Sequence, residues 1–198
     1  RLQVEHPVTE MVTGFDLVAE QLRVAAGDGL SAVQADIPQT GHSIELRICA
    51  EDATVDFRPA VGDILLLDEP TGPGVRVDSG ILDGGKVTTD FDPMLSKLIV
   101  HGQDRAQAIA RARQAVQNYV VLGVTTNTGY LDAILAHPDF ASGEVSTGFL
   151  AEQSETLTAT GEDVTDLLMA AAALSDERLV IEVMQIPEMY RKMGGWRN

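Results

Sequence analysis

The sequence has little cysteine and little positive charge. It contains one cysteine, Cys49, in 198 residues, so it cannot form an internal disulfide, and this usage fits a reducing cytoplasm. Lysine and arginine number 14 against 30 acidic residues, which gives a formal net charge of −16. A nucleic-acid phosphate backbone requires a basic face on its partner. We therefore expect a cytoplasmic protein that binds no nucleic acid.

Long apolar runs, targeting segments and a phosphate loop are also missing. No stretch approaches the roughly 18 apolar residues of a membrane span, and the first residues do not resemble a signal peptide. We therefore expect no membrane partner. The G-x-x-x-x-G-K-[ST] loop is absent. Because the chain starts with Arg1 inside a motif, we expect it to be a piece of a longer protein.

The most informative segment is the N-terminal decapeptide RLQVEHPVTE. If residues 1–5 form a strand, alternation places Arg1, Gln3 and Glu5 on one face. Guanidinium and amide groups suit a small planar anion, and a carboxylate beside them can accept a proton. A pocket that holds bicarbonate and deprotonates it needs these groups. An edge strand with a solvated polar face is the alternative interpretation of the same pattern.

Hydrophobic periodicity predicts an α+β fold with an antiparallel sheet. Alternation predicts strands over 43–50, 64–68, 75–78, 86–89 and 95–101. Helical spacing covers 8–13, 15–25, 104–119 and 127–136, with Asn127 as a capping residue and Pro138 ending the last helix. Residues 28–40 and 139–150 are expected to be largely irregular. Residues 151–161 have the composition of a linker, and a further helical pattern starts at Asp163.

The strand over 43–50 has the clearest alternation. Its apolar side chains, Ile44, Leu46 and Ile48, fall on one face and should point into the core. The opposite face then carries Glu45, Arg47 and Cys49.

The first 27 residues closely resemble the biotin carboxylase family, the ATP-grasp enzymes that carboxylate biotin in acyl-CoA and pyruvate carboxylases. Four later blocks continue the resemblance in order: GHSIELRICAED, GVRVDS, FDPMLSKLI and GVTTN. With the segments between and after these five blocks, the resemblance covers roughly residues 1–150. The resemblance implies that 1–30 end an ATP-grasp domain and that 31–150 form the biotin carboxylase C-terminal subdomain, an antiparallel sheet with helices. Residues 151–198 would be a linker and the start of a further helical region.

The family's reaction has two stages. Bicarbonate attacks the γ-phosphate of ATP to give carboxyphosphate, which then carboxylates N1 of biotin. The resemblance implies ATP, Mg²⁺ or Mn²⁺, and biotin on a biotin carboxyl carrier domain. It implies as further partners a carboxyltransferase domain or subunit, an upstream ATP-grasp half, and a second copy in a homodimer. This would be the first half-reaction of an acetyl-CoA or propionyl-CoA type carboxylase.

The resemblance assigns roles to particular residues of the first two blocks. Glu5 matches the base that deprotonates bicarbonate. Arg1 and Gln3 match groups that hold the anion, with a backbone contribution from Val4. Arg47 matches the arginine that stabilises the enolate-like form of biotin, and a fixed charge aimed at a developing oxyanion contributes roughly 3–4 kcal/mol.

Further assignments lie in the later blocks. Asp92 matches a carboxylate that holds Arg47, with an exposed turn aspartate as the alternative. Arg76 occupies a position near the two-fold interface of dimeric relatives, although Pro73 stands where some relatives carry an aromatic residue. Thr147 aligns with a residue that contacts adenine.

Three residues within these blocks receive no direct role. Lys97 is not distinguished from a surface lysine. His6 is interpreted as a structural histidine at a turn, and Cys49 as a small packed residue.

The resemblance places the metal-binding carboxylates and the phosphate-gripping lysines upstream of Arg1. The chain alone is therefore expected to be inactive, and an exposed apolar surface is expected where the upstream half would dock. Two alternatives remain open. One is another ATP-grasp ligase that joins a carboxylate to an amine, and the other is a non-catalytic domain that retains the fold.

Overall fold

The computed structural model describes residues 1–158 together with Met169 and Ala172. The chain separates into two units after Ala159, and every helix and strand given below lies in the first. The helical pattern predicted from Asp163 onward lies outside the described residues, apart from these two positions.

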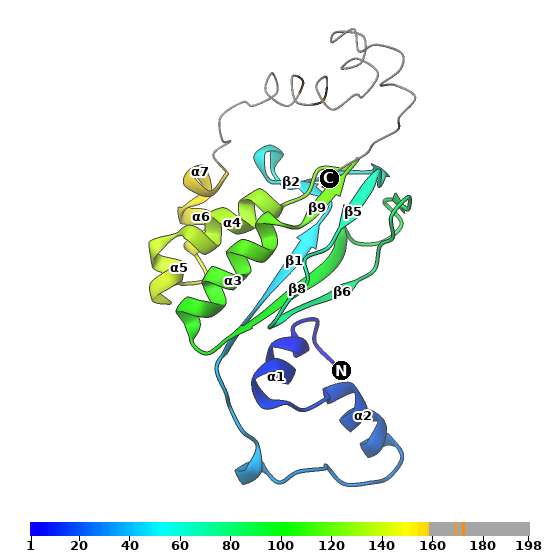
Figure 1. Ribbon diagram of the computed structural model, residues 1–198, viewed down its shortest axis with the longest axis vertical. Helices are drawn as coiled ribbons and strands as arrows, with labels where there is room; N and C mark the ends of the chain where they lie inside the picture. Colours follow the sequence, from blue (N-terminus) through cyan, green and yellow to red (C-terminus); the bar gives the residue numbers. More distant parts are fainter. Residues whose placement is uncertain (159–168, 170–171, 173–198) are drawn as a thin grey trace, which may run out of the picture. The chain divides into compact units, whose positions relative to one another are not determined.

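A three-stranded antiparallel sheet forms the centre of the first unit. Its strands are β1 (His42–Cys49), β8 (Met94–Gly102) and β6 (Val75–Ser79), in the order β1-β8-β6 (Figure 1). The pairing places Arg47 opposite Lys97, and Lys97 opposite Asp78. The predicted antiparallel sheet is confirmed, as are the strands over 43–50, 75–78 and 95–101 to within a residue or two.

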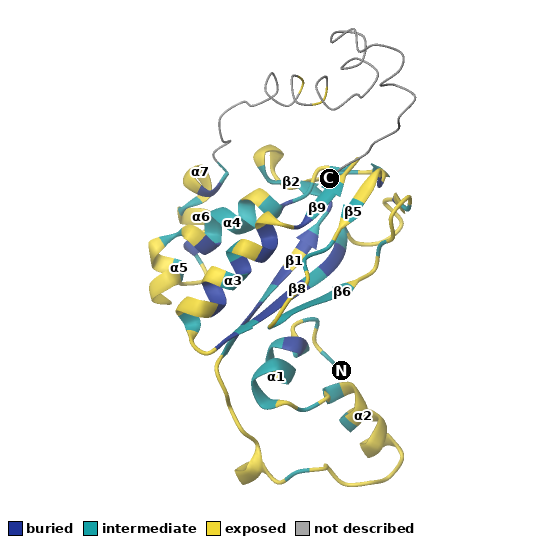
Figure 2. Ribbon diagram, viewed as in Figure 1, coloured by how far each residue is buried: buried dark blue, intermediate teal, exposed yellow. Residues whose placement is uncertain are grey.

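One face of this sheet is apolar and packs against two helices, α3 (Arg105–Gln117) and α4 (Thr128–Ala136). Figure 2 shows the buried residues concentrated along β1, β8 and α3. The core between them consists of Ile44, Leu46, Ile48, Leu98, Val100, Ala108, Ile109, Ala112, Ala115, Val116, Tyr119 and Leu135. The predicted core face of β1 is therefore confirmed, and so is the helix predicted over 104–119, which corresponds to α3.

The opposite face of the sheet carries charged side chains and is contacted by α1 (His6–Thr13). The predicted strand over residues 1–5 is wrong, because Val4 and Glu5 form a turn that leads into α1. Pro7 favours this outcome, since proline suits the first turn of a helix. The His6 ring closes the turn through Nδ1, 2.7 Å from the Gln3 carbonyl oxygen. Arg1, Gln3 and Glu5 are nevertheless exposed and Leu2 and Val4 half-buried, so exposure alternates along this segment without a strand.

Helix α2 (Leu17–Ala25) follows α1 and begins at Asp16, whose carboxylate accepts from the Ala19 N–H at 2.8 Å. The segment 28–40 is irregular apart from a 3-10 turn over Gln34–Asp36. Both features agree with the sequence-based expectation.

Short elements complete the unit. Two-stranded ladders join β2 (Glu51–Asp52) to β3 (Arg58–Pro59), β4 (Gly62–Asp63) to β7 (Lys86–Val87), and β5 (Leu66–Asp68) to β9 (Val120–Leu122). A 3-10 turn (Ala53–Val55) and the helices α5 (Pro138–Ser142), α6 (Phe149–Glu152) and α7 (Ser154–Leu157) lie between and after them. The strand predicted over 64–68 is shorter in the structure, because the buried Ile64 lies outside a strand and β5 begins only at Leu66. Pro138 starts α5 as well as ending α4.

Candidate active site

The structure brings together two of the predicted site residues that lie 42 positions apart. Arg47 Nη2 donates to Glu5 Oε2 at 3.1 Å. Strand β1 presents Arg47 on its polar face, and the turn before α1 presents Glu5 toward it. Each side chain is about half exposed, at 52% and 53%. The two side chains therefore contact each other and remain accessible to a substrate.

Lys97 is a site residue that sequence reasoning missed. Its ammonium group donates to the Val4 carbonyl oxygen at 3.1 Å and lies 3.2 Å from Asp78 Oδ2. The sequence could have indicated this role, because Lys97 lies inside a predicted strand, two residues before the core residue Ile99. In the structure this strand is the middle one of the sheet. The segment that contains the predicted bicarbonate contacts is thus attached to β8.

A second set of ion pairs attaches α1 to β6. Arg76 Nη1 donates to Glu10 Oε2 at 2.7 Å, and Arg76 Nε donates to Asp78 Oδ1 at 2.7 Å. These hydrogen bonds raise the pKa of Arg76 further above its ordinary value. Burial acts to raise the pKa of Asp78, but hydrogen bonds from Arg76 and Lys97 outweigh it and hold this pKa below the usual range. Arg76 and Asp78 are therefore both charged at neutral pH.

Glu45 lies two residues before Arg47 on the same face of β1. Both of its carboxylate oxygens are buried and lack a hydrogen-bond partner among the described residues. Burial raises the pKa of this carboxyl, while the charges of Lys97 and Arg47 act in the opposite direction. Glu45 is therefore a buried acidic group beside the site whose charge is only partly balanced by its neighbours.

Asn127 is the N-cap residue of α4, as predicted, but its side chain makes no capping hydrogen bond and supports the end of β1 instead. Its side chain accepts from the Cys49 N–H at 2.9 Å and donates to the Arg47 carbonyl oxygen at 3.1 Å and to Glu51 Oε1 at 3.2 Å. The side chain reaches β1 because Asn127 lies in the connection before α4, where the β1 register shifts between Ile48 and Cys49. It fixes the backbone on both sides of that shift, directly beside Arg47.

Two further residues behave as structural groups. The His6 ring is occupied by its hydrogen bond to the Gln3 carbonyl, as expected for a histidine at a turn. Burial, together with the nearby carboxylates of Glu51 and Asp92, raises the pKa of Cys49 to about 11, so its thiol is protonated at neutral pH.

The remaining predicted site residues are not joined to the Arg47–Glu5 pair by any hydrogen bond. Arg1 and Gln3 are exposed at the start of the chain. The Asp92 carboxylate accepts from the Met94 N–H at 3.0 Å and makes no ion pair with Arg47 in this structure. Thr147 is exposed in the turn before α6.

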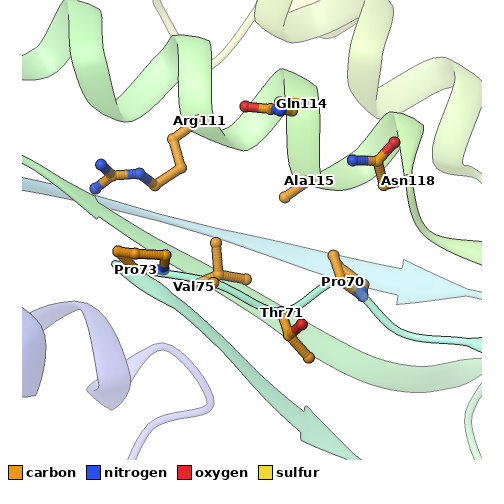
Figure 3. A pocket seen from close by; sticks show the side chains of 9 residues that line it. Pro70, Thr71, Pro73, Val75, Arg111, Gln114, Ala115 and Asn118 are labelled. Atoms are coloured by element: carbon orange, nitrogen blue, oxygen red, sulfur yellow. The ribbon is translucent and has the colours of Figure 1, made fainter.

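Neither Glu5 nor Arg47 lines any of the cavities identified among the described residues. A cavity of about 300 Å³ lies between the 70–75 loop and α3, and Figure 3 shows Arg111 and Gln114 of α3 facing Pro73 and Thr71 across it. It shares no lining residue with the predicted site. Among residues 1–158, Met169 and Ala172, no group of three or more His, Cys, Asp or Glu side chains could hold a metal ion.

An apolar surface lies beside the N-terminal segment. Leu22, Val24, Leu30 and Val33 are exposed on α2 and in the loop that follows it, and Figure 2 shows α2 largely exposed. Two shallow cavities in this region are lined mainly by apolar side chains, among them Leu2, Leu17 and Leu30. Such a cluster on an isolated chain is typical of a surface that another part covers. No helix in the described part of the chain is long and apolar enough to cross a membrane.

Comparison with known proteins identifies the family to which this fold belongs. Residues 45–152 match the family model of the biotin carboxylase C-terminal domain, and residues 1–33 match that of the carbamoyl-phosphate synthase L chain ATP-binding domain. The chain belongs to the biotin carboxylase C-terminal domain family.

Individual relatives agree with this family. The chain is 46% identical over 155 residues to biotin carboxylase of Nostoc sp., covering 78% of this chain and 35% of the relative. The human propionyl-CoA carboxylase alpha chain is 47% identical over 154 residues, covering 77% of this chain and 21% of the relative. The chain thus spans about a third or less of the length of these relatives.

Solved structures give the same result. The biotin carboxylase domain dimer of Hydrogenobacter thermophilus 2-oxoglutarate carboxylase, in complex with MgADP, ADP and bicarbonate, superimposes with a TM-score of 0.78 at 40% identity. The match covers 81% of this chain and 36% of that chain. The biotin carboxylase subunit of a pyruvate carboxylase matches with a TM-score of 0.78 at 38% identity, with the same coverage. The expected α+β fold is confirmed.

Proposed function

We propose that this chain is the C-terminal part of a biotin carboxylase, which uses ATP and bicarbonate to carboxylate biotin on a carrier domain. The observation that carries the proposal is the 3.1 Å contact between Arg47 and Glu5. It joins the residue assigned to biotin with the residue assigned to bicarbonate. The two reactants must meet in one site, and this pair supplies a base and a fixed positive charge within contact of each other.

The contact leaves other hydrogen-bonding atoms of both side chains available. Glu5 uses Oε2 toward Arg47, so Oε1 is available to accept the proton of bicarbonate. Arg47 uses Nη2, so its Nε and Nη1 donors are available to an oxyanion that develops on biotin. We propose that Arg1, Gln3 and the Val4 backbone hold the bicarbonate. Asp92 is proposed as a support for Arg47 in the complete enzyme, and Thr147 as an adenine contact.

The rest of the site is proposed to come from an ATP-grasp half that precedes Arg1 in the parent protein. When bound, magnesium or manganese with ATP supplies an activated phosphoryl group and neutralises its charge. We propose that this half covers the exposed apolar surface around α2. Residues 1–30 are assigned to the end of the ATP-grasp domain, 31–150 to the C-terminal subdomain, and 151–198 to a linker with the start of a helical region.

The relatives suggest the setting in which such a site works. We propose that the parent is a cytoplasmic carboxylase that acts with a biotin carboxyl carrier domain and a carboxyltransferase domain or subunit. Its acyl-CoA or pyruvate substrate would be chosen by the carboxyltransferase. Arg76 is proposed to lie near a homodimer interface.

The experiment is phosphate release from ATP by the parent protein, with bicarbonate and free biotin. We expect release to be stimulated by biotin, lost in Glu5→Gln, and no longer coupled to biotin in Arg47→Ala. Arg113→Ala is the matched control, because Arg113 also forms an ion pair, with Asp132 at 2.8 Å, and is similarly exposed. Release that is indifferent to biotin and to both site substitutions would favour another ATP-grasp ligase.

A further inference from the structure

Lys97 lies at the centre of a row of charged side chains that crosses the three-stranded sheet. Arg47 on β1 and Asp78 on β6 are its register partners in the two neighbouring strands. Directly opposite residues share a face of the sheet, and this is the face contacted by α1. Only 13% of the Lys97 side chain is exposed, so it is not an ordinary surface lysine.

The ammonium group of Lys97 connects the sheet to the backbone immediately before Glu5. It donates to the Val4 carbonyl oxygen at 3.1 Å and pairs with Asp78 Oδ2 at 3.2 Å. The Val4 carbonyl belongs to the peptide bond that leads into Glu5. A displacement of this carbonyl would therefore displace the Glu5 side chain as well.

A second cation fixes the same segment farther along. Arg76 binds Glu10 of α1 at 2.7 Å, and its Nε and Nη2 bind the Asp78 carboxylate that also receives Lys97. Glu10 in turn accepts from the Leu17 N–H at 2.9 Å through its other oxygen. The segment is thus held at residue 4 and at residue 10 by two cations that share one carboxylate.

The choice of lysine here is not explained by packing. Like charges directly opposite each other on neighbouring strands are destabilising, and Lys97 stands opposite Arg47. Each cation needs its own anion to offset this, and the structure supplies Glu5 for Arg47 and Asp78 for Lys97. An apolar residue would fill the position without this repulsion, but it could not hold the Val4 carbonyl.

We propose that Lys97 is a positioning residue that places Val4 and Glu5 for the binding of bicarbonate. The inference rests on the proposed function, because it takes the Arg1–Glu5 segment as the bicarbonate site. Lys97 acts through the Val4 carbonyl, and its loss loosens the segment without removing any group that contacts the substrate. The effect should therefore fall on bicarbonate more than on ATP.

The test compares Lys97→Met and Lys97→Arg in the parent protein, with Lys86→Met as the matched control because Lys86 is exposed on β7. We expect Lys97→Met to raise KM for bicarbonate about tenfold, because the variant loses one charge-assisted hydrogen bond. KM for ATP should stay within about twofold of the original value, because the substitution removes no contact to ATP. Lys97→Arg keeps a donor and should recover most of the loss.

Two results would overturn the inference. One is an unchanged KM for bicarbonate in Lys97→Met. The other is a proportional rise in the KM values for ATP and bicarbonate together with a lower unfolding temperature, which would assign Lys97 a structural role alone. If Lys97→Met does not yield folded protein, Lys97→Gln is judged by the same criteria. A parent protein without biotin-stimulated phosphate release would instead refute the proposed function, and this outcome is seen before any variant is made.

Discussion

Replacing Glu45 by Met should stabilise the chain at neutral pH and change how its stability depends on pH. Both carboxylate oxygens of Glu45 are buried and have no hydrogen-bond partner among the described residues. Leaving a buried polar group unsatisfied costs about 1–3 kcal/mol, and more when the group is charged. Met is unbranched and similar in length, so it fills the same space without that cost.

The sign follows from the direction of the pKa shift. Burial raises the pKa of Glu45 in the folded chain above its ordinary value. Between the unfolded and folded pKa values, the folded state holds a proton that the unfolded state has released. The contribution of this group to stability therefore falls as the pH rises through that window and stays low above it. Glu45→Met removes this fall, so its advantage over the original chain should be small at pH 4 and larger at pH 8.

The assay is urea denaturation of the 198-residue chain and the variant at a series of pH values. The quantity of interest is the difference in unfolding free energy between the two proteins, because other carboxylates contribute equally to both. We expect this difference to grow with pH to about 1–3 kcal/mol. A constant difference, or a variant less stable at pH 8, would show that Arg47 and Lys97 already compensate Glu45 and would refute the reasoning.

Two further predictions concern groups around the end of β1. Asn127→Ala loses hydrogen bonds to Cys49, Arg47 and Glu51; urea denaturation should show a loss of about 2–3 kcal/mol, whereas Asn118→Ala, at an exposed position, should change stability little. The Cys49 thiol, with its pKa raised to about 11, should react with a disulfide reagent at pH 8 about a hundredfold more slowly than a thiol of ordinary pKa. A fast reaction, or an Asn127 variant as stable as the control, would contradict these assignments.

The core was predictable because its signal is local. Alternation along β1 places Ile44, Leu46 and Ile48 on one face, and the structure buries all three. The helical stripe that ends at Tyr119 covers them in the same way. Burial of an apolar face supplies most of the stabilisation of such elements, so pattern alone determines which side faces inward.

The N-terminal segment shows where local reasoning fails. The alternation of residues 1–5 resembles a strand, but Pro7 and the His6–Gln3 contact produce a turn and a helix instead. The contact between Glu5 and Arg47 that the proposal needs is long-range and follows from how α1 packs on the sheet. Neither periodicity nor spacing could have supplied it, although the family resemblance named both residues.

Lys97 and Asn127 were misjudged for a related reason. A lysine and an asparagine carry strong local expectations, exposure for one and helix capping for the other. In the structure each is used by a distant backbone group, the Val4 carbonyl and the Arg47–Cys49 segment. Polar side chains that satisfy remote backbone groups leave no periodic trace in the sequence.

The central claim is that this chain contributes to the carboxylation of biotin. The most direct measurement is the incorporation of ¹⁴C-labelled bicarbonate into biotin by the parent protein in the presence of ATP. We expect label in biotin that requires ATP and disappears in Glu5→Gln. Phosphate release from ATP with no label in biotin, under conditions where the Arg113→Ala control behaves as the unmodified protein, would contradict this claim.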